Sequence, residues 1–391
     1  TAYRRQRQMC IRDRGELRVG NPGALRVDVG PVIDAEAQTG ITQHIEKFKA
    51  QGHRVFQHTS HLAATSAPGT FVPPTLIELN HIGELEREVF GPVLHLVRYA
   101  RDDLDRLLDQ INATGYGLTQ GVHTRIDETI ARVVNRAHAG NVYVNRNMVG
   151  AVVGVQPFGG EGLSGTGPKA GGPLYLLRLL SQRPADALAR TFAEADRLSP
   201  PDIERRERQL APLGSLQQWA HNQGNLALAG HCQRFAQETQ SGTARTLPGP
   251  TGERNVYTLA PRARVLCMAQ SADDLLLQTA AVLASGCTAL WPSTQAGLRT
   301  TLPTHVQAQV TLQDNAVSDG SVALDAVLHH GDAESLRTVC AALARRPGPV
   351  VGMTALQPGA TDIPLERLLI ERALSVNTAA AGGNASLMTI G

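Results

Sequence analysis

The sequence has few cysteines, almost no net charge and no long apolar run. A net charge of +2 provides no basic surface for nucleic acid or for a membrane. No apolar stretch approaches the roughly 20 residues that span a bilayer. The five cysteines form no CxxC pair, and three of them lie in apolar segments, which is typical of buried free thiols. These absences indicate a cytoplasmic protein without a membrane span and without a nucleic-acid partner.

The remaining composition is that of a globular protein, with 42% apolar and 18% charged residues among 391. This length allows two or more domains, each with its own core. Residues 1–14 are an exception, because TAYRRQRQMCIRDR carries five arginines, shows almost no apolar periodicity and lacks the apolar region of a signal peptide. We interpret residues 1–14 as a tail unrelated to the fold, with a basic nucleic-acid arm as the alternative.

From residue 15 the chain alternates between helical and extended patterns. Apolar residues recur at helical spacing in residues 102–115 and 125–140, and both stretches end at a glycine. NVYVNRN, residues 141–147, reads as a strand, and the glycine-rich residues 150–173 read as a loop. GPLYLLRLL, residues 172–180, predicts a further strand.

A second alternation follows a boundary region. Residues 185–254 carry polar helical patterns and end in SGTARTLPGPTGERN, which predicts a linker. Residues 255–391 then predict a second domain built as a doubly wound, mostly parallel α/β sheet. The predicted strands are residues 263–269, 287–292, 322–330, 349–356 and 371–380, and the predicted helices are residues 272–286 and 332–348.

Three motifs that suggest cofactor or metal chemistry fail on their context. GTGPKA, residues 165–170, matches G-x-G-x-x-A, but no strand precedes it and no helix follows it. The same stretch fails as a P-loop, since Pro168 occupies the lysine position. His221, His231 and Cys232 lack the spacing of metal ligands, so we expect no metal site.

Several longer motifs occur in an informative order: VGNPGALRVDVGPVID, REVFGPVL, NATGYGLTQGVHT and VNRNMVGAVVGVQPFGGEGLSGTGPKAGGP. Together they resemble the C-terminal half of the catalytic region of the aldehyde dehydrogenase superfamily. The resemblance is strongest to the glutamate-semialdehyde (pyrroline-5-carboxylate) dehydrogenase part of fused bacterial proline-catabolic enzymes. It covers residues 15–184, and the ending LSVNTAAAGGNASLMTIG resembles the terminus of longer members.

The resemblance implies a role for five residues. In the E-x-F-G-P motif, Glu88 would accept hydrogen bonds from the ribose hydroxyls of NAD, and Phe90 would pack beside the nicotinamide. In the loop that anchors the aldehyde, the backbone N–H groups of Gly150 and Ala151 would hold the substrate's α-carboxylate. Phe158 would line the aliphatic part of the aldehyde pocket.

The resemblance also implies what the chain lacks. Family members oxidise the aldehyde through a cysteine thiolate and hydrolyse the thioester with a glutamate-activated water. Both residues lie ahead of residue 15 in the family, so this chain is expected to be an inactive fragment that also lacks the FAD-dependent proline dehydrogenase part. In the second domain, Trp291 and Thr294 replace residues that reach the adenosine ribose, which predicts a degenerate accessory domain. Residues 172–180 resemble the strand through which family members form homo-oligomers.

Other interpretations remain open. Taken alone, Glu88 would fit an exposed acid beside a strand, and Phe90 and Phe158 ordinary core residues, but the ordered motifs favour the functional interpretation. The chain also fits a fragment of another aldehyde dehydrogenase, whose anchor loop selects a different aldehyde. A non-catalytic structural or assembly module is the alternative from a different class.

Overall fold

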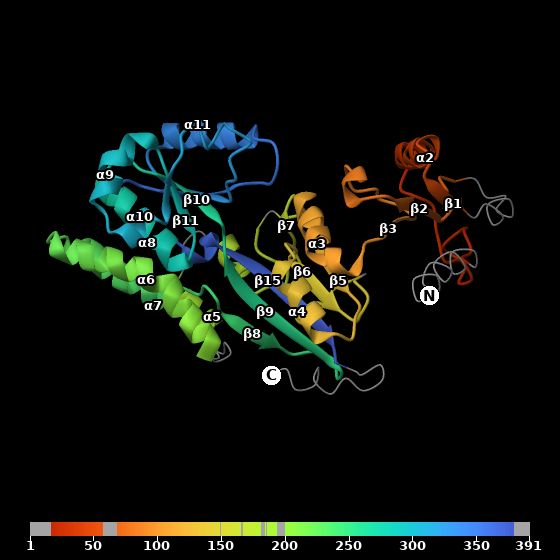
Figure 1. Ribbon diagram of the computed structural model, residues 1–391, viewed down its shortest axis with the longest axis horizontal. Helices are drawn as coiled ribbons and strands as arrows, with labels where there is room; N and C mark the ends of the chain where they lie inside the picture. Colours follow the sequence, from red (N-terminus) through yellow and green to blue (C-terminus); the bar gives the residue numbers. More distant parts are fainter. Residues whose placement is uncertain are drawn as a thin grey trace. The chain divides into compact units, whose positions relative to one another are not determined.

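Figure 1 shows the fold as a computed structural model. The residues that it describes are 17–57, 69–148, 150–165, 167–180, 184, 186–193 and 200–378. The predicted tail at residues 1–14 and the end of the chain from residue 379 lie outside this part. The chain divides into two compact units, residues 1–114 and 115–391, each described by itself below. Within the described residues, no helix is long and apolar enough to cross a membrane.

The first unit packs helix α2 on a three-stranded sheet. Its elements are α2 (Ala35–Ala50), β1 (Arg54–Gln57), β2 (Thr75–Leu79), η1 (Ile82–Glu84), β3 (Val93–Val97), η2 (Arg101–Asp103) and α3 (Leu104–Ala113). β2 lies in the middle of the sheet, antiparallel to β1 and parallel to β3. The Asp34 carboxylate caps α2 by accepting the N–H of Ala37 at 2.7 Å. Ile41, Ile45 and Phe48 of α2 are buried in a core shared with β2.

The second unit contains two five-stranded sheets. Its first elements are β4 (Tyr116–Gly117), β5 (Thr119–Val122), α4 (Asp127–Arg136), β6 (Asn141–Val144), β7 (Glu161–Gly162), η3 (Leu176–Leu179) and α5 (Ala187–Thr191). They are followed by α6 (Pro200–Asn222), α7 (Leu226–Glu238), β8 (Ala244–Leu247), β9 (Glu253–Pro261), β10 (Arg264–Met268), α8 (Ala272–Ser285), β11 (Thr288–Trp291), η4 (Ser293–Gln295) and α9 (Ala296–Thr301). The last elements are α10 (Thr304–Gln307), β12 (Val310–Leu312), β13 (Ala326–His330), α11 (Ala333–Ala344), β14 (Gly352–Leu356), η5 (Leu365–Leu368) and β15 (Leu369–Asn377).

The first sheet joins strands from distant parts of the sequence in the order β5-β6-β15-β9-β8. β15 runs parallel to β6 on one side and antiparallel to β9 on the other, where the two strands pair along their whole length (Figure 1). The sheet around β6 is therefore completed by the last described strand of the chain.

The second sheet confirms the predicted doubly wound α/β architecture. Its order is β12-β11-β10-β13-β14, and every neighbouring pair is parallel. α8 is apolar nearly all round and is buried between this sheet and helices α6 and α7 (Figure 1). The Ser271 hydroxyl caps its N-terminus, and Gly286, with φ of 78°, ends it in the left-handed conformation.

Three sequence predictions about local structure need correction. Residues 172–180 form no strand, because Gly172 and Pro173 turn the chain and, among the described residues, no neighbouring strand completes a hydrogen-bond ladder; η3 forms instead. The predicted linker at residues 241–255 contains β8 and the start of β9, a hairpin that belongs to the first sheet. The strand predicted at residues 371–380 exists as β15, but it pairs with β6 and β9 and not with the parallel sheet.

Candidate functional site

The E-x-F-G-P motif forms a corner immediately before β3. The N–H of Val93 donates to the carbonyl of Gly91 at 2.8 Å, and the carbonyl of Pro92 accepts the N–H of Thr75 at 2.9 Å. These bonds fasten the corner to β2 at the start of the β2–β3 ladder. A side chain on Gly91 would contact Ile41 of α2, so a glycine lets the corner lie close to that helix.

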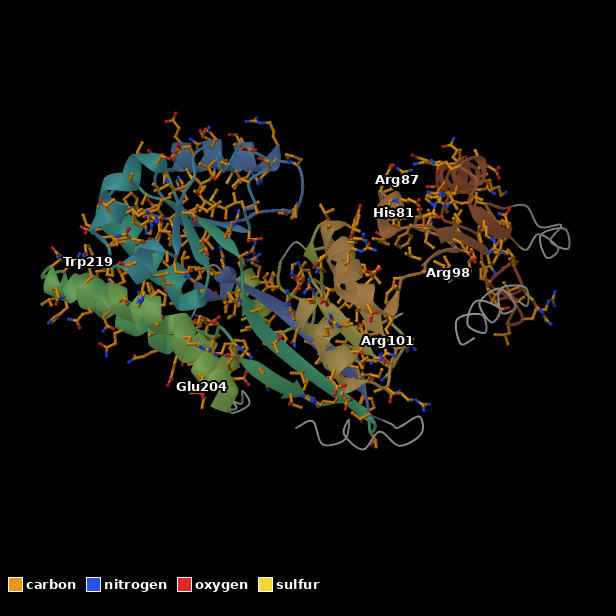
Figure 2. All side chains as sticks on the ribbon, in the orientation of Figure 1. His81, Arg87, Arg98, Arg101, Glu204 and Trp219 are labelled. Atoms are coloured by element: carbon orange, nitrogen blue, oxygen red, sulfur yellow. The ribbon has the colours of Figure 1, made fainter. Side chains whose placement is uncertain are left out.

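In the described part of the first unit, no residue pairs with the Glu88 carboxylate, and the side chain of Phe90 is largely uncovered. Glu88 is exposed, and among the described residues its carboxylate has no hydrogen-bond or ion-pair partner. The ring of Phe90 is 86% exposed, which is unusual for an aromatic side chain of this size. Figure 2 labels Arg87 and His81 on the same loop. A carboxylate that can accept two hydroxyl donors beside an uncovered ring fits the ribose and nicotinamide of NAD.

Residues 146–156, the predicted anchor segment, follow β6 in the second unit and include Gly150 and Ala151. Gly150 is exposed and Ala151 is half-buried. In the described part of the chain, neither backbone N–H donates to a protein acceptor, which leaves both free for an anion. A side chain on Gly150 would meet no protein atom, so the protein itself does not require glycine here.

Phe158 lies at the other end of this loop and is half-buried. Its N–H donates to the carbonyl of Ala170 at 3.0 Å, and the N–H of Ala170 donates back at 2.8 Å. This two-way bridge fixes the backbone from which the ring projects. Glu88 and Phe90 belong to the first unit, and Phe158 belongs to the second.

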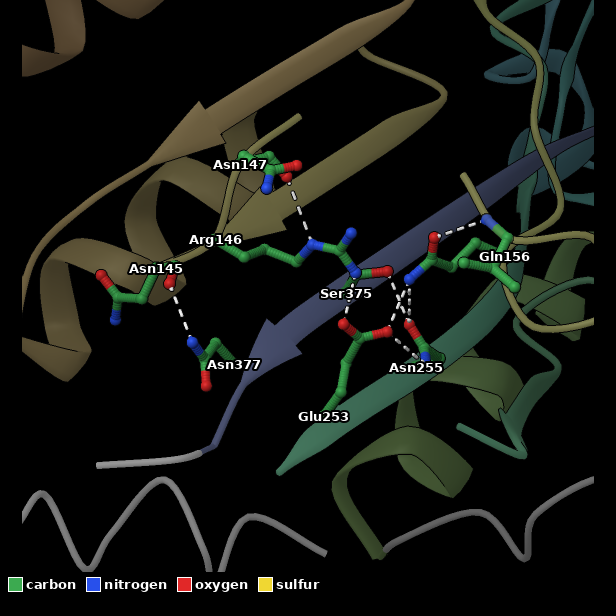
Figure 3. Close-up of polar contacts among 9 residues, drawn as sticks. Asn145, Arg146, Asn147, Gln156, Glu253, Asn255, Ser375 and Asn377 are labelled. Atoms are coloured by element: carbon green, nitrogen blue, oxygen red, sulfur yellow. Dashed lines mark hydrogen bonds and ion pairs between the residues drawn. The ribbon is translucent and has the colours of Figure 1, made fainter. Parts of the chain in front are cut away.

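The anchor segment is fastened to β9 by a polar cluster (Figure 3). Gln156, which is 3% exposed, accepts the N–H of Val152 at 3.0 Å through Oε1. Its Nε2 donates to Oε1 of Glu253 at 2.5 Å. The guanidinium of Arg146 pairs with Oε2 of the same carboxylate and lies 5.1 Å above the ring of Tyr143.

A second cluster holds the glycine-rich part of the loop. The buried ammonium of Lys169 donates to Oδ1 of Asn141 at 2.9 Å and to the carbonyl of Gly159. Burial lowers the pKa of Lys169 to about 8. Glu371 on β15 accepts the backbone N–H of Lys169 and the hydroxyl of Tyr257, each at 2.7 Å. Burial raises the pKa of the Glu371 carboxyl above its ordinary value.

Sequence reasoning missed both clusters. Lys169 lies in the GTGPKA stretch, which was considered only as a nucleotide motif. Local patterns do not reveal the contact of Gln156 with Glu253, which lies 97 residues away, or that of Glu371 with Lys169, 202 residues away. Glu371 gave no clear signal either, because β15 also contains Arg372, Ser375 and Asn377.

The three buried cysteines among the described residues do not suit nucleophilic chemistry. Cys232, Cys267 and Cys287 are buried, and burial raises the pKa of all three thiols, to about 12 for Cys232 and Cys287. A thiol with a raised pKa carries almost no thiolate near neutral pH, so these residues are poor nucleophiles. Cys340 is exposed on α11, and Cys10 lies outside the described residues.

The parallel sheet has its topological switch point between β10 and β13, the place where doubly wound sheets bind ligands. Gln278 reaches this place, and its Nε2 donates to the carbonyls of Met268 and Leu328 at 2.9 and 3.2 Å. The same side chain contacts His330 Nδ1 at 2.8 Å. Asp273 and Asp274 stand in the first turn of α8 and oppose a phosphate there. Gln278 and His330 therefore lie at the switch point, and the two acids of α8 disfavour a phosphate at its N-terminus.

Comparisons with known proteins place these features in context. Residues 2–183 match the sequence profile of the aldehyde dehydrogenase family. The bifunctional protein PutA of Salmonella typhimurium is 58% identical over 381 residues, which are 96% of this chain and 29% of that protein. The 1-pyrroline-5-carboxylate dehydrogenase of Bacillus pumilus is 42% identical over 158 residues, 40% of this chain and 30% of that enzyme. The chain thus spans less than a third of the length of these curated relatives.

One solved structure has a related fold over most of the chain. Proline utilization A (PutA) from Corynebacterium freiburgense has a TM-score of 0.61 at 20% sequence identity. The similarity covers 95% of this chain and 34% of that chain. At this identity the likeness establishes the fold alone.

Proposed function

Because residues 2–183 match the profile of the aldehyde dehydrogenase family, we propose that the chain is part of an NAD-dependent L-glutamate γ-semialdehyde dehydrogenase. This activity is the second step of proline catabolism and yields glutamate. The observation that carries the proposal is the 58% identity to the bifunctional protein PutA along 96% of the chain. The similarity to a 1-pyrroline-5-carboxylate dehydrogenase supports the same substrate.

In this proposal the first unit supplies residues for the cofactor. Glu88 accepts hydrogen bonds from the nicotinamide ribose, and Phe90 limits the position of the ring beside it. The Glu88 carboxylate, which has no partner among the described residues, and the exposed ring of Phe90 support these roles. NAD, when bound, supplies the acceptor for the hydride of the aldehyde.

The second unit supplies residues for the substrate. The N–H groups of Gly150 and Ala151 bind the α-carboxylate of the semialdehyde, and Phe158 contacts its aliphatic carbons. The absence of intrachain acceptors for these N–H groups among the described residues supports the assignment. Binding the carboxylate orients the aldehyde and keeps its reactive carbon at a fixed distance from the anchor.

The nucleophilic cysteine and the general-base glutamate lie, in this proposal, in sequence outside these 391 residues, and the chain alone is inactive. The burial and raised pKa of Cys232, Cys267 and Cys287 support this view. FAD belongs only to the proline dehydrogenase part of the longer protein. The free thiols agree with a cytoplasmic location, and the exposed leucines of η3, Leu176 and Leu179, agree with a homo-oligomer.

We assign a structural role to the parallel sheet. Gln278 and His330 fill its switch point, which supports a unit that no longer binds a nucleotide. This observation favours a non-catalytic module for this part of the chain, while the resemblance of residues 15–184 favours an enzyme.

Substitution of Glu88 in the full-length protein tests the proposed function. We expect Glu88→Ala to raise the KM for NAD about tenfold, because two charge-assisted hydrogen bonds to the ribose are lost. Glu86→Ala is the matched control, since Glu86 is an exposed acid two residues earlier whose ion pair with Lys47 at 3.4 Å contributes little. An unchanged KM for NAD in Glu88→Ala, or wild-type protein without NAD-dependent oxidation of the semialdehyde, would contradict the proposal.

A further inference from the structure

The segment between Arg146 and Gln156 contains the two predicted carboxylate-binding residues, and its two ends meet at one carboxylate. Glu253 stands at the first position of β9, with 15% of its side chain exposed. Its Oε2 pairs with the guanidinium of Arg146 at the start of the segment. Its Oε1 accepts Nε2 of Gln156, at the end of the segment, at 2.5 Å. Glu253 thus closes the segment into a loop (Figure 3).

Glu253 is itself held in place by residues of β9 and β15. Nδ2 of Asn255, which is 2% exposed, donates to Oε1 of Glu253 at 3.0 Å. Oδ1 of Asn255 in turn accepts the hydroxyl of Ser375 on β15 at 2.6 Å. The carboxylate therefore has partners on three sides, and its position is determined by the paired strands β9 and β15.

The closure of the loop also determines which of its N–H groups have a protein acceptor. Oε1 of Gln156 accepts the N–H of Val152 at 3.0 Å, so this donor is turned toward the protein. The preceding N–H groups, those of Gly150 and Ala151, have no acceptor among the described residues. Glu253 neutralises the charge of Arg146, so this arginine does not compete with the two N–H groups for an anion.

We propose that Glu253 is a positioning residue for carboxylate recognition: by holding Arg146 and Gln156 it fixes the segment in the form that presents the N–H groups of Gly150 and Ala151. The inference rests on the proposed function, because it assumes that this segment binds the α-carboxylate. It assigns a role in substrate selection to β9, which lies outside residues 2–183 of the family match. An aldehyde without an α-carboxylate does not use these N–H groups.

The test compares two substrates in the full-length protein, L-glutamate γ-semialdehyde and propanal, which lacks the carboxylate. In Glu253→Ala we expect the ratio of kcat/KM for the semialdehyde to kcat/KM for propanal to fall about tenfold, mainly through KM for the semialdehyde. Glu253→Gln, which keeps one oxygen acceptor for Gln156, should give an intermediate ratio. If Glu253→Ala does not fold, Gln156→Met removes the contact to Val152 at similar volume and should lower the ratio in the same way.

Glu161→Ala is the matched control. Glu161 also forms a part-buried pair with an arginine, Arg372 of β15, at 2.7 and 3.1 Å, but among the described residues no hydrogen bond or ion pair joins it to the segment. Its loss should reduce stability and leave the substrate ratio within about twofold. Equal ratios in Glu253→Ala and Glu161→Ala, or an unchanged ratio in Glu253→Ala with active wild-type protein, would overturn this inference alone. Wild-type protein inactive on the semialdehyde would overturn the proposed function and this inference with it.

Discussion

The backbone N–H of Lys169 donates to Oε2 of Glu371 at 2.7 Å, although 202 residues separate the two along the chain. Oε1 of Glu371 accepts the hydroxyl of Tyr257 at 2.7 Å, so the same carboxylate joins β15, β9 and the glycine-rich loop. The loop that carries the predicted aldehyde-binding residues is therefore held by strands from the end of the chain. This relationship makes the stability of the loop depend on buried charged groups.

The first prediction concerns the buried ammonium of Lys169. Burial lowers its pKa from 10.5 to about 8, so between these values the unfolded chain binds more protons than the folded chain. Stability should therefore rise with pH across this window, by about 3 kcal/mol at most. Lys169→Met should remove this slope. Denaturant unfolding of the full-length protein at several pH values between about 8 and 10.5 measures the slope of the unfolding free energy with pH.

The control for that experiment is Lys49→Met. Lys49 is an exposed lysine whose ammonium pairs with Glu46 at 2.8 Å on the surface of α2. Its removal should leave the pH dependence of stability unchanged. An equal slope in wild-type protein and Lys169→Met would contradict the buried-ammonium explanation.

The second prediction concerns two histidines of the first unit. Nε2 of His44 and Nε2 of His95 are 2.8 Å apart, so only one proton can lie between them. Burial, and then the nearby His44, lowers the pKa of His95 from 6.5 to about 4; burial, and then Lys47 and Arg87, lowers that of His44. Both folded pKa values lie below the unfolded value, so stability is full above pH 6.5 and is lost as the pH falls toward 4.

We expect His95→Gln to remove much of this acid sensitivity, about 1–2 kcal/mol after solvent screening is taken into account. Unfolding free energies measured across this acidic range give the comparison. His81→Gln serves as the control, because the His81 side chain is 61% exposed. The explanation is wrong if both variants lose stability in acid as steeply as the wild type.

The third prediction concerns the largest buried side chain, Trp291. Its indole N–H donates to the hydroxyl of Thr279 on α8 at 3.0 Å, and both residues are fully buried. Thr279→Val keeps the shape but leaves the indole N–H without an acceptor, which should cost about 1–3 kcal/mol. Thr279→Ser retains the hydroxyl and should cost less. Thermal and urea unfolding distinguish the two, and a reversed order would contradict the role of the hydroxyl.

The fourth prediction compares two glycines. A side chain on Gly140 would overlap the carbonyl oxygen of Gly159, so Gly140→Ala must displace the loop from β6 and should cost about 3 kcal/mol or more. Gly214 lies inside α6 with open space around the position of a side chain. Gly214→Ala should therefore stabilise the protein by about 0.5–1 kcal/mol. Melting temperatures of the two variants should move in opposite directions.

Local sequence patterns predicted several helices and four of the five strands of the parallel sheet, β10, β11, β13 and β14. α4, α8 and α11 lie inside the predicted helical ranges: α4 and α11 bury one apolar side, and α8 is apolar nearly all round. η3 shows the limit of such patterns. Its leucines have the composition of a strand, but strand formation depends on a partner that local sequence does not specify.

The site was predictable only where long motifs were available. Glu88, Phe90, Gly150, Ala151 and Phe158 were identified through an ordered resemblance, and their roles remain proposals. The contacts of Glu253 and Glu371 could not be predicted, because they depend on the pairing of β15 with β6 and β9. Such pairing between distant segments leaves no periodic signal in either one.

The position of β15 has a consequence for synthesis of the protein on the ribosome. Asn377 at the end of β15 bonds to Asn145, which emerges 232 residues earlier. At a synthesis rate of about 5–20 residues per second, about 10–50 seconds pass between the synthesis of β6 and that of β15. During this time the N–H and C=O groups along one edge of β6 have no strand to pair with. An open strand edge is a template for pairing with another chain. Nascent chains on one polysome can therefore pair wrongly with one another at the edge of β6 until β15 has been synthesised.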